Sequence, residues 1–368
     1  MKVLAIAETL KIQSGWGRYA RSIIDEYKKK GIDYTIITAR KKEATGEEDG
    51  VLGPQTKLGF IKNLFATRAY AKDCDIVHAY DVWPYAVYGW FAVLGTKKRL
   101  FITGVGTYSV APFNSFLKGT LAGWACRRAE KIFSIADYTK RRMLEKINLN
   151  NITTVFWGTS VLEPLSDVDY AEQVAFFDIP LDRHPRILTV GQIKHRKGQL
   201  DTLKALAKLK DQYPDFLYVI VGSDEDPRYI GEIKKFAAEQ GIERNVRLIH
   251  NAKGDKPLRF FYAMTDVFAM NSNNDGDHFE GFGLVFLEAE QFGKPVIGSS
   301  GCGIEQALED GYNGYLTRQS DIDDIADKFK KLFSGDMSAF GAHSKEFYKR
   351  FTWEKTAAAY IEHYNQKT

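Results

Sequence analysis

The chain has 368 residues, enough for two domains of ordinary size with buried cores. Apolar residues make up 44% and charged residues 27%, which excludes a disordered or fibrous protein. The three cysteines, Cys74, Cys126 and Cys302, are far apart and include no CxxC pair, which excludes a zinc ribbon and a disulfide framework. No apolar run reaches the ~20 residues of a membrane span, and the first one is too short for a signal sequence. We therefore expect a cytoplasmic protein.

The net charge of +4 is unevenly distributed. Residues 1–175 hold 25 Lys or Arg and 18 Asp or Glu, a net +7, whereas the remainder holds 26 and 29, a net −3. A basic half is typical of proteins with an anionic partner such as a phospholipid surface or a phosphorylated acceptor, although solvated helix faces give the same count. A nucleic-acid partner is not expected, because no aromatic and basic motif of a known binding module is present.

Short β-branched runs alternate with helical patterns along the first half of the chain. Helical spacing of apolar residues is clear over residues 17–30. The expected strands are residues 2–7, 34–38, 75–79, 100–103, 131–136 and 152–156. This alternation predicts a parallel sheet covered by helices on both faces.

The alternation restarts after an interruption at residues 160–185, which we interpret as a linker. The second series of expected strands is 186–190, 216–221, 246–249, 266–270, 295–299 and 314–316. Two series predict two doubly wound Rossmann-like α/β domains facing each other across a cleft, residues 1–170 and 171–350. The tail predicts an amphipathic helix over 352–366, capped by Thr352, that completes the first domain.

Two basic and aromatic stretches in the first half bear on membrane binding. The first, residues 57–72, puts Phe60, Ile61, Leu64 and Phe65 on one helix face with Lys and Arg around them. The second is residues 113–128. Each could be an ordinary helix packed on a sheet, and together with the basic half they make an anionic membrane surface a candidate partner.

The segment around Glu280 is the most informative for function. A strand is followed by a turn containing Gly281 and Gly283, and then by a helix carrying Glu288. A glycine turn at a helix N-terminus presents backbone N–H groups and the positive end of the helix dipole, which favours phosphate. Glu288 lies about two helical turns after Glu280, over much the same face. A helix-capping Glu280 and a solvated Glu288 are the simpler alternative.

A second segment places cations at the start of another helix. Lys194, Arg196 and Lys197 follow the strand 186–190, where positive charge opposes the helix dipole unless an anion binds. In the first half, Gly15 and Gly17 form a further glycine turn between a strand and a helix, which alone is a weak signal.

These motifs, in this order, resemble the retaining glycosyltransferases of family 4, which have the GT-B fold. The residues that carry the resemblance are Gly15 and Gly17, Asp75 to His78, Gly191 with Arg196 to Gly198, Glu280 to Leu284 with Glu288, and Gly293 to Val296. The resemblance extends over the whole chain and is more specific in the second half.

The resemblance implies transfer of a sugar from a UDP- or GDP-sugar to a lipid-linked or saccharide acceptor, in cell-surface polysaccharide, lipopolysaccharide or glycolipid synthesis. It implies that Lys197 stabilises the diphosphate leaving group, that Glu280 lies by the transferred sugar and that Glu288 binds the ribose. Arg196 is expected to bind the donor as well. Gly281, Phe282, Gly283 and Leu284 would face the sugar and phosphate through their amides, and Gly15 and Gly17 would close over the donor. No cofactor and no metal are implied, and the site would lie at the inner face of the cell membrane.

The chain departs from the family pattern at two positions. Gln192 replaces a usual Arg, and Val105, beside Gly104, stands where a His is usual. His78 could supply an imidazole instead, or it could be a core histidine. These departures leave open a catalytically silent nucleotide-sugar-binding protein, and another GT-B enzyme such as a nucleotide-sugar epimerase is a further alternative.

The short acidic sequence Asp275-Gly-Asp277 resembles a metal-binding DxD motif. It lies in a polar loop of a chain patterned as two doubly wound domains, and we expect no metal there.

Overall fold

The computed structural model describes residues 1–11, 14–39, 48–252 and 254–366. The chain divides into two compact units, here unit 1 (Met1–Gly158 with Phe351–Thr368) and unit 2 (Thr159–Arg350). The units meet at Gly158 and Thr159, which is earlier in the chain than the division we expected between residues 170 and 171. The C-terminal helix is grouped with unit 1, as expected.

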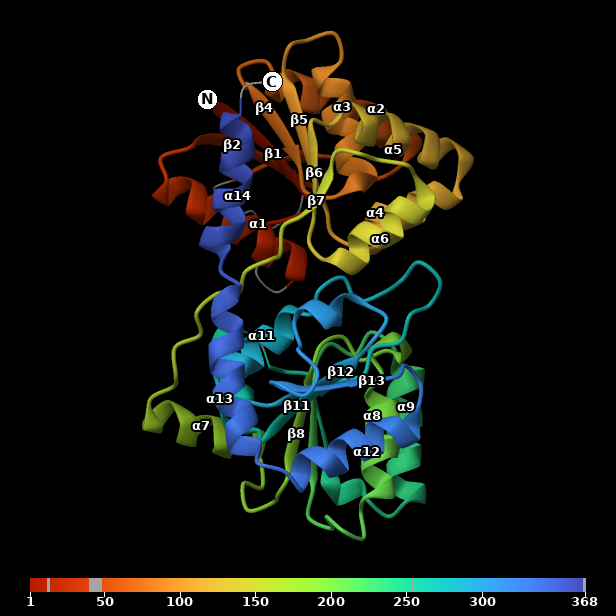
Figure 1. The fold of residues 1–368 in the computed structure, drawn as a ribbon, viewed down its shortest axis with the longest axis vertical. Helices are drawn as coiled ribbons and strands as arrows, with labels where there is room; N and C mark the ends of the chain where they lie inside the picture. Colours follow the sequence, from red (N-terminus) through yellow and green to blue (C-terminus); the bar gives the residue numbers. More distant parts are fainter. Residues whose placement is uncertain (12–13, 40–47, 253, 367–368) are drawn as a thin grey trace. The chain divides into compact units, whose positions relative to one another are not determined.

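Unit 1 is built on a seven-stranded parallel sheet of order β3-β2-β1-β4-β5-β6-β7 (Figure 1). Its strands are β1 (Lys2–Ala7), β2 (Asp33–Ala39), β3 (Asp49–Leu52), β4 (Ile76–Ala79), β5 (Arg99–Gly104), β6 (Lys131–Ser134) and β7 (Ile152–Thr154). The central strands β1 and β4 are almost entirely buried, as expected for a sheet with helices on both faces.

Two helix layers cover this sheet. Its helices are α1 (Gly15–Lys29), α2 (Lys57–Tyr70), α3 (Val87–Val93), α4 (Thr107–Val110), α5 (Phe116–Arg128), α6 (Asp137–Lys146) and α14 (Trp353–Asn365). Neighbouring strand residues point to opposite faces: Val77 packs beside Gly89 of α3, whereas His78 contacts Tyr364 of α14. In Figure 1, α1 and α14 lie together, apart from the group formed by α2, α3 and α5.

Unit 2 repeats the architecture on a six-stranded parallel sheet of order β10-β9-β8-β11-β12-β13. Its strands are β8 (Arg186–Val190), β9 (Leu217–Val221), β10 (Val246–Ile249), β11 (Val267–Met270), β12 (Val296–Ser299) and β13 (Gly314–Thr317). Its helices are α7 (Asp167–Phe177), α8 (Gln199–Lys208), α9 (Pro227–Glu239), α10 (Asp255–Met264), α11 (Leu284–Gln291), α12 (Ile322–Phe333) and α13 (Met337–Phe347).

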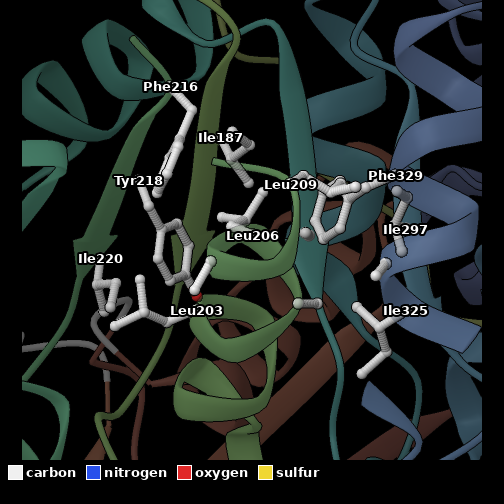
Figure 2. Packing of buried hydrophobic residues seen from close by; sticks show 14 of the residues in the cluster. Ile187, Leu203, Leu206, Leu209, Phe216, Tyr218, Ile220, Ile297, Ile325 and Phe329 are labelled. Carbon is white, nitrogen blue, oxygen red and sulfur yellow. The ribbon is translucent and has the colours of Figure 1, made fainter. Parts of the chain in front are cut away.

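The core of unit 2 joins α8 and α12 to the sheet. Figure 2 shows Leu206 of α8 against Ile187 of β8, with Leu203 one turn away on the same helix and Phe329 of α12 alongside. All four side chains are at most 1% exposed. The prediction of two doubly wound α/β domains is confirmed, because buried apolar strands alternating with amphipathic helices bury their surface best in this layered form.

Two local predictions were wrong. The segment 160–185 contains helix α7, whose Ser166 cap and whose Tyr170 and Phe177 contacts with Phe260 of α10 hold it on unit 2. Strand β3 was not predicted, because its four residues are polar at the start and only Leu52 is buried. Among the described residues, no helix combines the length and the apolarity needed to cross a bilayer.

Candidate active site

The turn before α11 is held in a narrow conformation by glycines. Gly283 has φ of +91°, a region that disfavours other residues, and it precedes the first turn of α11. Gly303 donates its N–H to the carbonyl of Glu280 at 2.8 Å, and a Cβ on Gly303 would lie 2.0 Å from the Gly281 oxygen. Phe282 is buried and Leu284 half-buried beside them. The turn is therefore fixed, with the positive end of the α11 dipole at its exit.

A second glycine brings the cationic segment to the same place. Residues His195–Lys197 form a short 3₁₀ turn after β8, ended by Gly198 at φ of +67°. A Cβ on Gly198 would lie 1.8 Å from the carbonyl oxygen of Asn271, directly after β11. Only glycine fits this approach, which puts the cations at the carboxyl ends of β8 and β11, where ligands bind in open α/β sheets.

Lys197 and Glu280 form the central contact of the site. Lys197 Nζ lies 2.5 Å from Glu280 Oε2, and Arg196 Nη1 lies 3.4 Å from the same oxygen. The Lys197 and Glu280 side chains are only 12% and 15% exposed. Three residues chosen from the sequence, up to 84 positions apart, thus meet in one half-buried cluster.

The electrostatics of this cluster favour an added anion. Burial alone raises the pKa of the Glu280 carboxyl, but Lys197 and Arg196 hold that pKa below its usual value, so the carboxylate is charged. Burial, followed by the nearby Arg196 and Lys197, lowers the pKa of Lys194. Three cations thus stand against two carboxylates, Glu280 and Glu225, and a bound anion would relieve the remaining repulsion.

Gln192, which stands where the family usually has Arg, is engaged on both sides. Its Nε2 lies 2.7 Å from Glu225 Oε1, and its Oε1 accepts from Lys194 Nζ at 2.5 Å. The amide therefore links Lys194 to an acidic side chain of the loop after β9. With Gln192 in place of Arg, the cluster carries one positive charge fewer.

Glu288 lies on α11 and is more deeply buried than Glu280, which precedes the helix. It is 3% exposed, and its Oε2 accepts a hydrogen bond of 2.7 Å from the Tyr262 hydroxyl. Glu290, two residues later, points to a different partner: its Oε1 accepts from Asn313 Nδ2 at 2.9 Å, and burial raises its pKa strongly. Glu288 is thus oriented by Tyr262, whereas Glu290 is a core carboxyl.

The predicted site residues of unit 1 lie around the carboxyl ends of β1, β4 and β5. Gly17 approaches the backbone of Lys11 so closely that a Cβ would lie 1.9 Å from its oxygen, whereas Gly15 has open space. The Ser14 hydroxyl accepts the Gly17 N–H at 3.0 Å and caps α1. Closure of this turn over a donor stays a prediction.

His78 is a core histidine, so its assignment to the substrate side was wrong. It is 0% exposed, and its Nδ1 and Nε2 contact the Tyr364 hydroxyl at 2.5 Å and the Thr103 hydroxyl at 2.9 Å. Burial lowers its pKa to about 3, so the ring is neutral. The ring joins α14 to the sheet.

Gly104 and Val105 end β5. Gly104 is buried, and a Cβ there would lie 2.8 Å from the sulfur of Met143. Val105 is 7% exposed, and its N–H donates to the Ser109 hydroxyl at 2.9 Å. Because residue 105 is a valine and not a histidine, it supplies no imidazole at the end of β5.

Sequence reasoning missed Asp81, which follows β4 directly and lines a hollow of about 590 Å³ in unit 1. The signal was present, since a carboxylate directly after a buried parallel strand points to the ligand-binding edge of a sheet. In unit 2, Arg196 also lines a smaller hollow of about 400 Å³ with Asp201, Lys204 and Asn273.

Within the described part of the chain, His, Cys, Asp and Glu side chains form no group of three or more suited to a metal. Asp275 instead pairs through its backbone with His278 in a tight turn. The expected absence of a metal stays a prediction.

Comparisons with known proteins agree with this geometry. Residues 173–351 match the family model described as glycosyl transferases group 1. A D-inositol 3-phosphate glycosyltransferase of Corynebacterium urealyticum is 34% identical over 184 residues, which cover 48% of this chain and 41% of the relative. A GDP-mannose-dependent alpha-(1-6)-phosphatidylinositol monomannoside mannosyltransferase of Mycolicibacterium smegmatis is 30% identical, over 39% of this chain and 37% of the relative. The chain thus matches less than half the length of either relative.

Among solved structures, HepE of Anabaena in complex with UDP and glucose superposes with a TM-score of 0.82 at 18% identity, over 100% of both chains. This likeness establishes the fold. The chain therefore has the fold of the GT-B glycosyltransferases, and its residues 173–351 are similar to the glycosyl transferases group 1.

Proposed function

We propose that the protein is a retaining, metal-independent glycosyltransferase that moves a sugar from a UDP- or GDP-sugar to a lipid-linked or saccharide acceptor. The observation that carries the proposal is the Lys197–Glu280 contact, with Arg196 beside it, at the start of α11. The related proteins support it by name: one is a GDP-mannose-dependent mannosyltransferase, and HepE binds UDP and glucose.

The cluster suits a diphosphate leaving group. Negative charge grows on the departing diphosphate as the bond to the sugar breaks, and fixed cations with a helix dipole stabilise that charge. Lys197 would meet the diphosphate, and Arg196 would stay paired with Glu280. Because these groups are already ordered and half-buried, little reorganisation is needed during reaction.

The two glutamates would hold the donor at two points. Glu280, charged and at the mouth of the turn, would accept a hydrogen bond from a hydroxyl of the transferred sugar. Glu288, oriented by Tyr262, would accept one from the ribose. In the reaction the acceptor oxygen bonds to the anomeric carbon as the bond to the diphosphate breaks, and the acceptor proton passes to the departing oxygen. Both events occur on one face of the sugar, so the configuration is retained.

We also propose that unit 1 rests on an anionic membrane surface. Helix α2 turns Gly59, Asn63 and Thr67 inward, while Leu58 is 64% and Phe65 is 62% exposed. In surface helices of globular proteins, the apolar side chains usually face the core and the polar ones face solvent. Of the predicted apolar face, Ile61 and Phe65 are exposed and Phe60 and Leu64 half-buried.

Helix α5 has the same inverted pattern. Its buried residues are Ala122, Gly123, Ala125 and Cys126, whereas Phe116 is 93% and Leu117 is 68% exposed. Helix α3 joins the two, because Phe91 contacts Phe65 of α2 and Trp90 contacts Trp124 of α5. We call the exposed side chains Leu58, Ile61, Phe65, Phe116, Leu117 and Trp124 the apolar surface of unit 1.

The charge around the apolar surface fits anionic lipid. Residues 82–129 contain six Lys or Arg and no Asp or Glu, and residues 50–72 contain no Asp or Glu either. Basic side chains near an anionic bilayer contribute roughly 1 kcal/mol each, and buried apolar side chains add to this.

Donor turnover tests the enzymatic proposal. The purified protein is incubated with UDP-glucose or GDP-mannose, and release of UDP or GDP is measured over hours with and without acceptor lipids. Slow release without acceptor is expected of a transferase. A silent binding protein would be stabilised by the nucleotide sugar without releasing nucleotide, and an epimerase would change the sugar without any acceptor.

Co-sedimentation with liposomes tests the membrane proposal. The double variant Phe116→Ser and Ile61→Ser should lose binding to phosphatidylglycerol liposomes, and Phe176→Ser is the control, since Phe176 of α7 is 67% exposed in unit 2. Arg68 is not a suitable target, because its Nη1 donates to the carbonyls of Phe91 and Leu94 and so holds α2 on α3. Equal binding by wild type and double variant would contradict the proposal.

A further inference from the structure

The smaller hollow of unit 2, of about 400 Å³, has the size of a site for a small molecule. Its lining comes from the turn after β8, from α8 and α9, from the loop after β11 and from Ser320. In Figure 1, α8, α9 and α12 lie together, apart from α11 and α13.

The helices beside this hollow cover the opposite face of the sheet from those that hold Glu288. Along β11, Val267 and Ala269 belong to the core that includes α8, α9 and α12. Phe268, between them, contacts Tyr262 of α10 and Phe286 of α11 instead. Tyr262 is also the residue that donates to Glu288. The hollow is therefore bordered by different helices from those of the proposed ribose contact.

Two polar groups that line the hollow have no partner within the part of the chain that the structure describes. Lys204 is half-buried, and its ammonium group makes no hydrogen bond or ion pair there. Asn273 Oδ1 is buried and unpaired, whereas its Nδ2 donates to Asp201 Oδ2 at 2.7 Å and so fixes the amide. An unpaired buried polar atom is costly, and a ligand hydroxyl relieves both groups, because it accepts from an ammonium and donates to an amide oxygen.

The charges of the hollow do not favour an anionic ligand. Three carboxylates line it, those of Asp201, Glu232 and Asp275. Two permanent cations line it as well, Arg196 and Lys204, and Arg196 is already paired in the active site. Among the described residues, these carboxylates belong to no group suited to a metal ion. A lining that mixes charged donors with charged acceptors suits a neutral ligand rich in hydroxyl groups.

An aromatic pair completes the lining. The His195 ring lies 4.1 Å from the Tyr229 ring, and both residues line the hollow. Tyr229 is 1% exposed, and its hydroxyl accepts from the Leu200 N–H at 2.8 Å, so its ring is a fixed support. The His195 side chain is 63% exposed and is therefore the accessible ring. A supported ring beside polar groups suits the C–H face of a sugar, because the face of an aromatic ring carries partial negative charge.

We propose that the smaller hollow of unit 2 is a second saccharide-binding site, separate from the donor site. A pyranose ring lies with its C–H face against His195. Its hydroxyl groups accept from Lys204 and donate to Asn273 Oδ1 and to the Asp201 carboxylate. Because Arg196 lines the hollow and also contacts Glu280, the saccharide is held next to the active site. The site goes beyond the proposed function, since sugar transfer does not require it.

Saturation-transfer difference NMR on the whole protein tests the site. The probes are the methyl α-glycosides of glucose, mannose and galactose, which carry no charge and no nucleotide. At least one should bind with a dissociation constant on the order of 1–10 mM, as expected for a ligand of this size. Inorganic phosphate and putrescine, added as competitors, probe for an anion or a cation in the same place and should leave the glycoside signal unchanged.

Three variants locate the bound glycoside. Lys204→Met keeps most of the side-chain length but removes the ammonium group, and it should weaken binding about 5- to 10-fold. Lys208→Met is the matched control, since Lys208 lies on the same helix, is exposed and pairs with Asp323 outside the hollow. Glu280→Gln alters the donor site and should keep the wild-type affinity for the glycoside. Melting curves show that each variant is folded.

Failure of all three glycosides to bind, or equal affinity in wild type and Lys204→Met, would overturn the proposal. Binding that is lost in Glu280→Gln but kept in Lys204→Met would place the sugar in the donor site and overturn it as well. Displacement of the glycoside by phosphate or putrescine at equal concentration would contradict a neutral saccharide as the occupant.

Discussion

At the scale of single residues, the site depends on charges that are kept in place by burial. Burial alone would raise the pKa of Glu280, and Lys197 and Arg196 offset this effect, whereas burial and the same two cations lower the pKa of Lys194. The sequence indicated that these cations need an anionic partner, because positive charge at the start of a helix opposes the helix dipole. It could not indicate that Glu280, 83 residues after Lys197, is their partner, since only folding brings them together.

We expect Lys197→Gln and Glu280→Gln each to lower transfer by about 100-fold or more, because each removes a fixed charge beside the reacting bond. Steady-state release of nucleotide in the presence of acceptor measures this. Lys208→Gln, which alters an exposed lysine of α8, is the matched control. Near-wild-type rates in both site variants would contradict the roles assigned to these residues.

Asp81 should make stability depend on pH. Burial raises its pKa from 3.8 to about 7, so between these values the folded state holds a proton that the unfolded state has lost. Stability therefore falls as pH rises through this range and is lowest above pH 7. Relative to wild type, the Asp81→Asn variant should gain on the order of 4 kcal/mol of stability between pH 4 and pH 8. Urea unfolding at both pH values measures the difference, and an unchanged difference would contradict the assignment.

At the scale of elements, turns that contain glycine position the functional side chains. Gly198 lets the cationic turn approach the end of β11, and Gly283 starts α11. Periodicity predicted the strands on both sides of these turns nearly to the residue. It left the packing of α2 open, because spacing alone does not say which face of a helix is buried. The small side chains of Gly59, Asn63 and Thr67 allow close packing, and the larger apolar ones are left outside.

Gly198→Ala should abolish stabilisation by UDP or GDP and lower the free energy of unfolding by about 1–3 kcal/mol. The added methyl group would meet the Asn271 carbonyl and also require a strained φ. Gly276→Ala is the control, since its φ is +58° but no atom outside its neighbours lies within 4 Å of the added Cβ. Similar effects of the two substitutions would show that backbone strain alone, without the close approach, accounts for the loss.

At the scale of the whole molecule, the chain returns to unit 1 for its last helix. Helix α14 fixes β4 and β5 through polar contacts: Tyr364 binds His78 and Tyr27, and Arg99 Nη2 donates to the His363 carbonyl at 2.8 Å. The sequence predicted an amphipathic helix capped by Thr352, and the cap is confirmed. The buried tyrosine and histidine network could not be predicted, because residues 286 positions apart share no local pattern.

A chain that ends at Arg350 should lose protection from amide hydrogen exchange in β4 and β5 but keep it in β8 and β9. His78 would lose its contact with Tyr364, and Arg99 would lose the carbonyls of His363 and Tyr364, and an unpaired buried group costs about 1–3 kcal/mol. Mass spectrometry of the exchanged peptides measures both sheets in one experiment. Equal protection of β4 and β5 with and without α14 would contradict the structural role of this helix.

We infer that unit 2 binds the diphosphate of a nucleotide sugar between Lys197 and the start of α11. A crystal structure of the protein with UDP-glucose or GDP-mannose tests it most directly. We predict phosphate oxygens within hydrogen-bond distance of Lys197 Nζ and of the amides of residues 281–284, with the ribose at Glu288. A nucleotide bound elsewhere on the chain, with the Lys197–Glu280 contact undisturbed, would contradict the account.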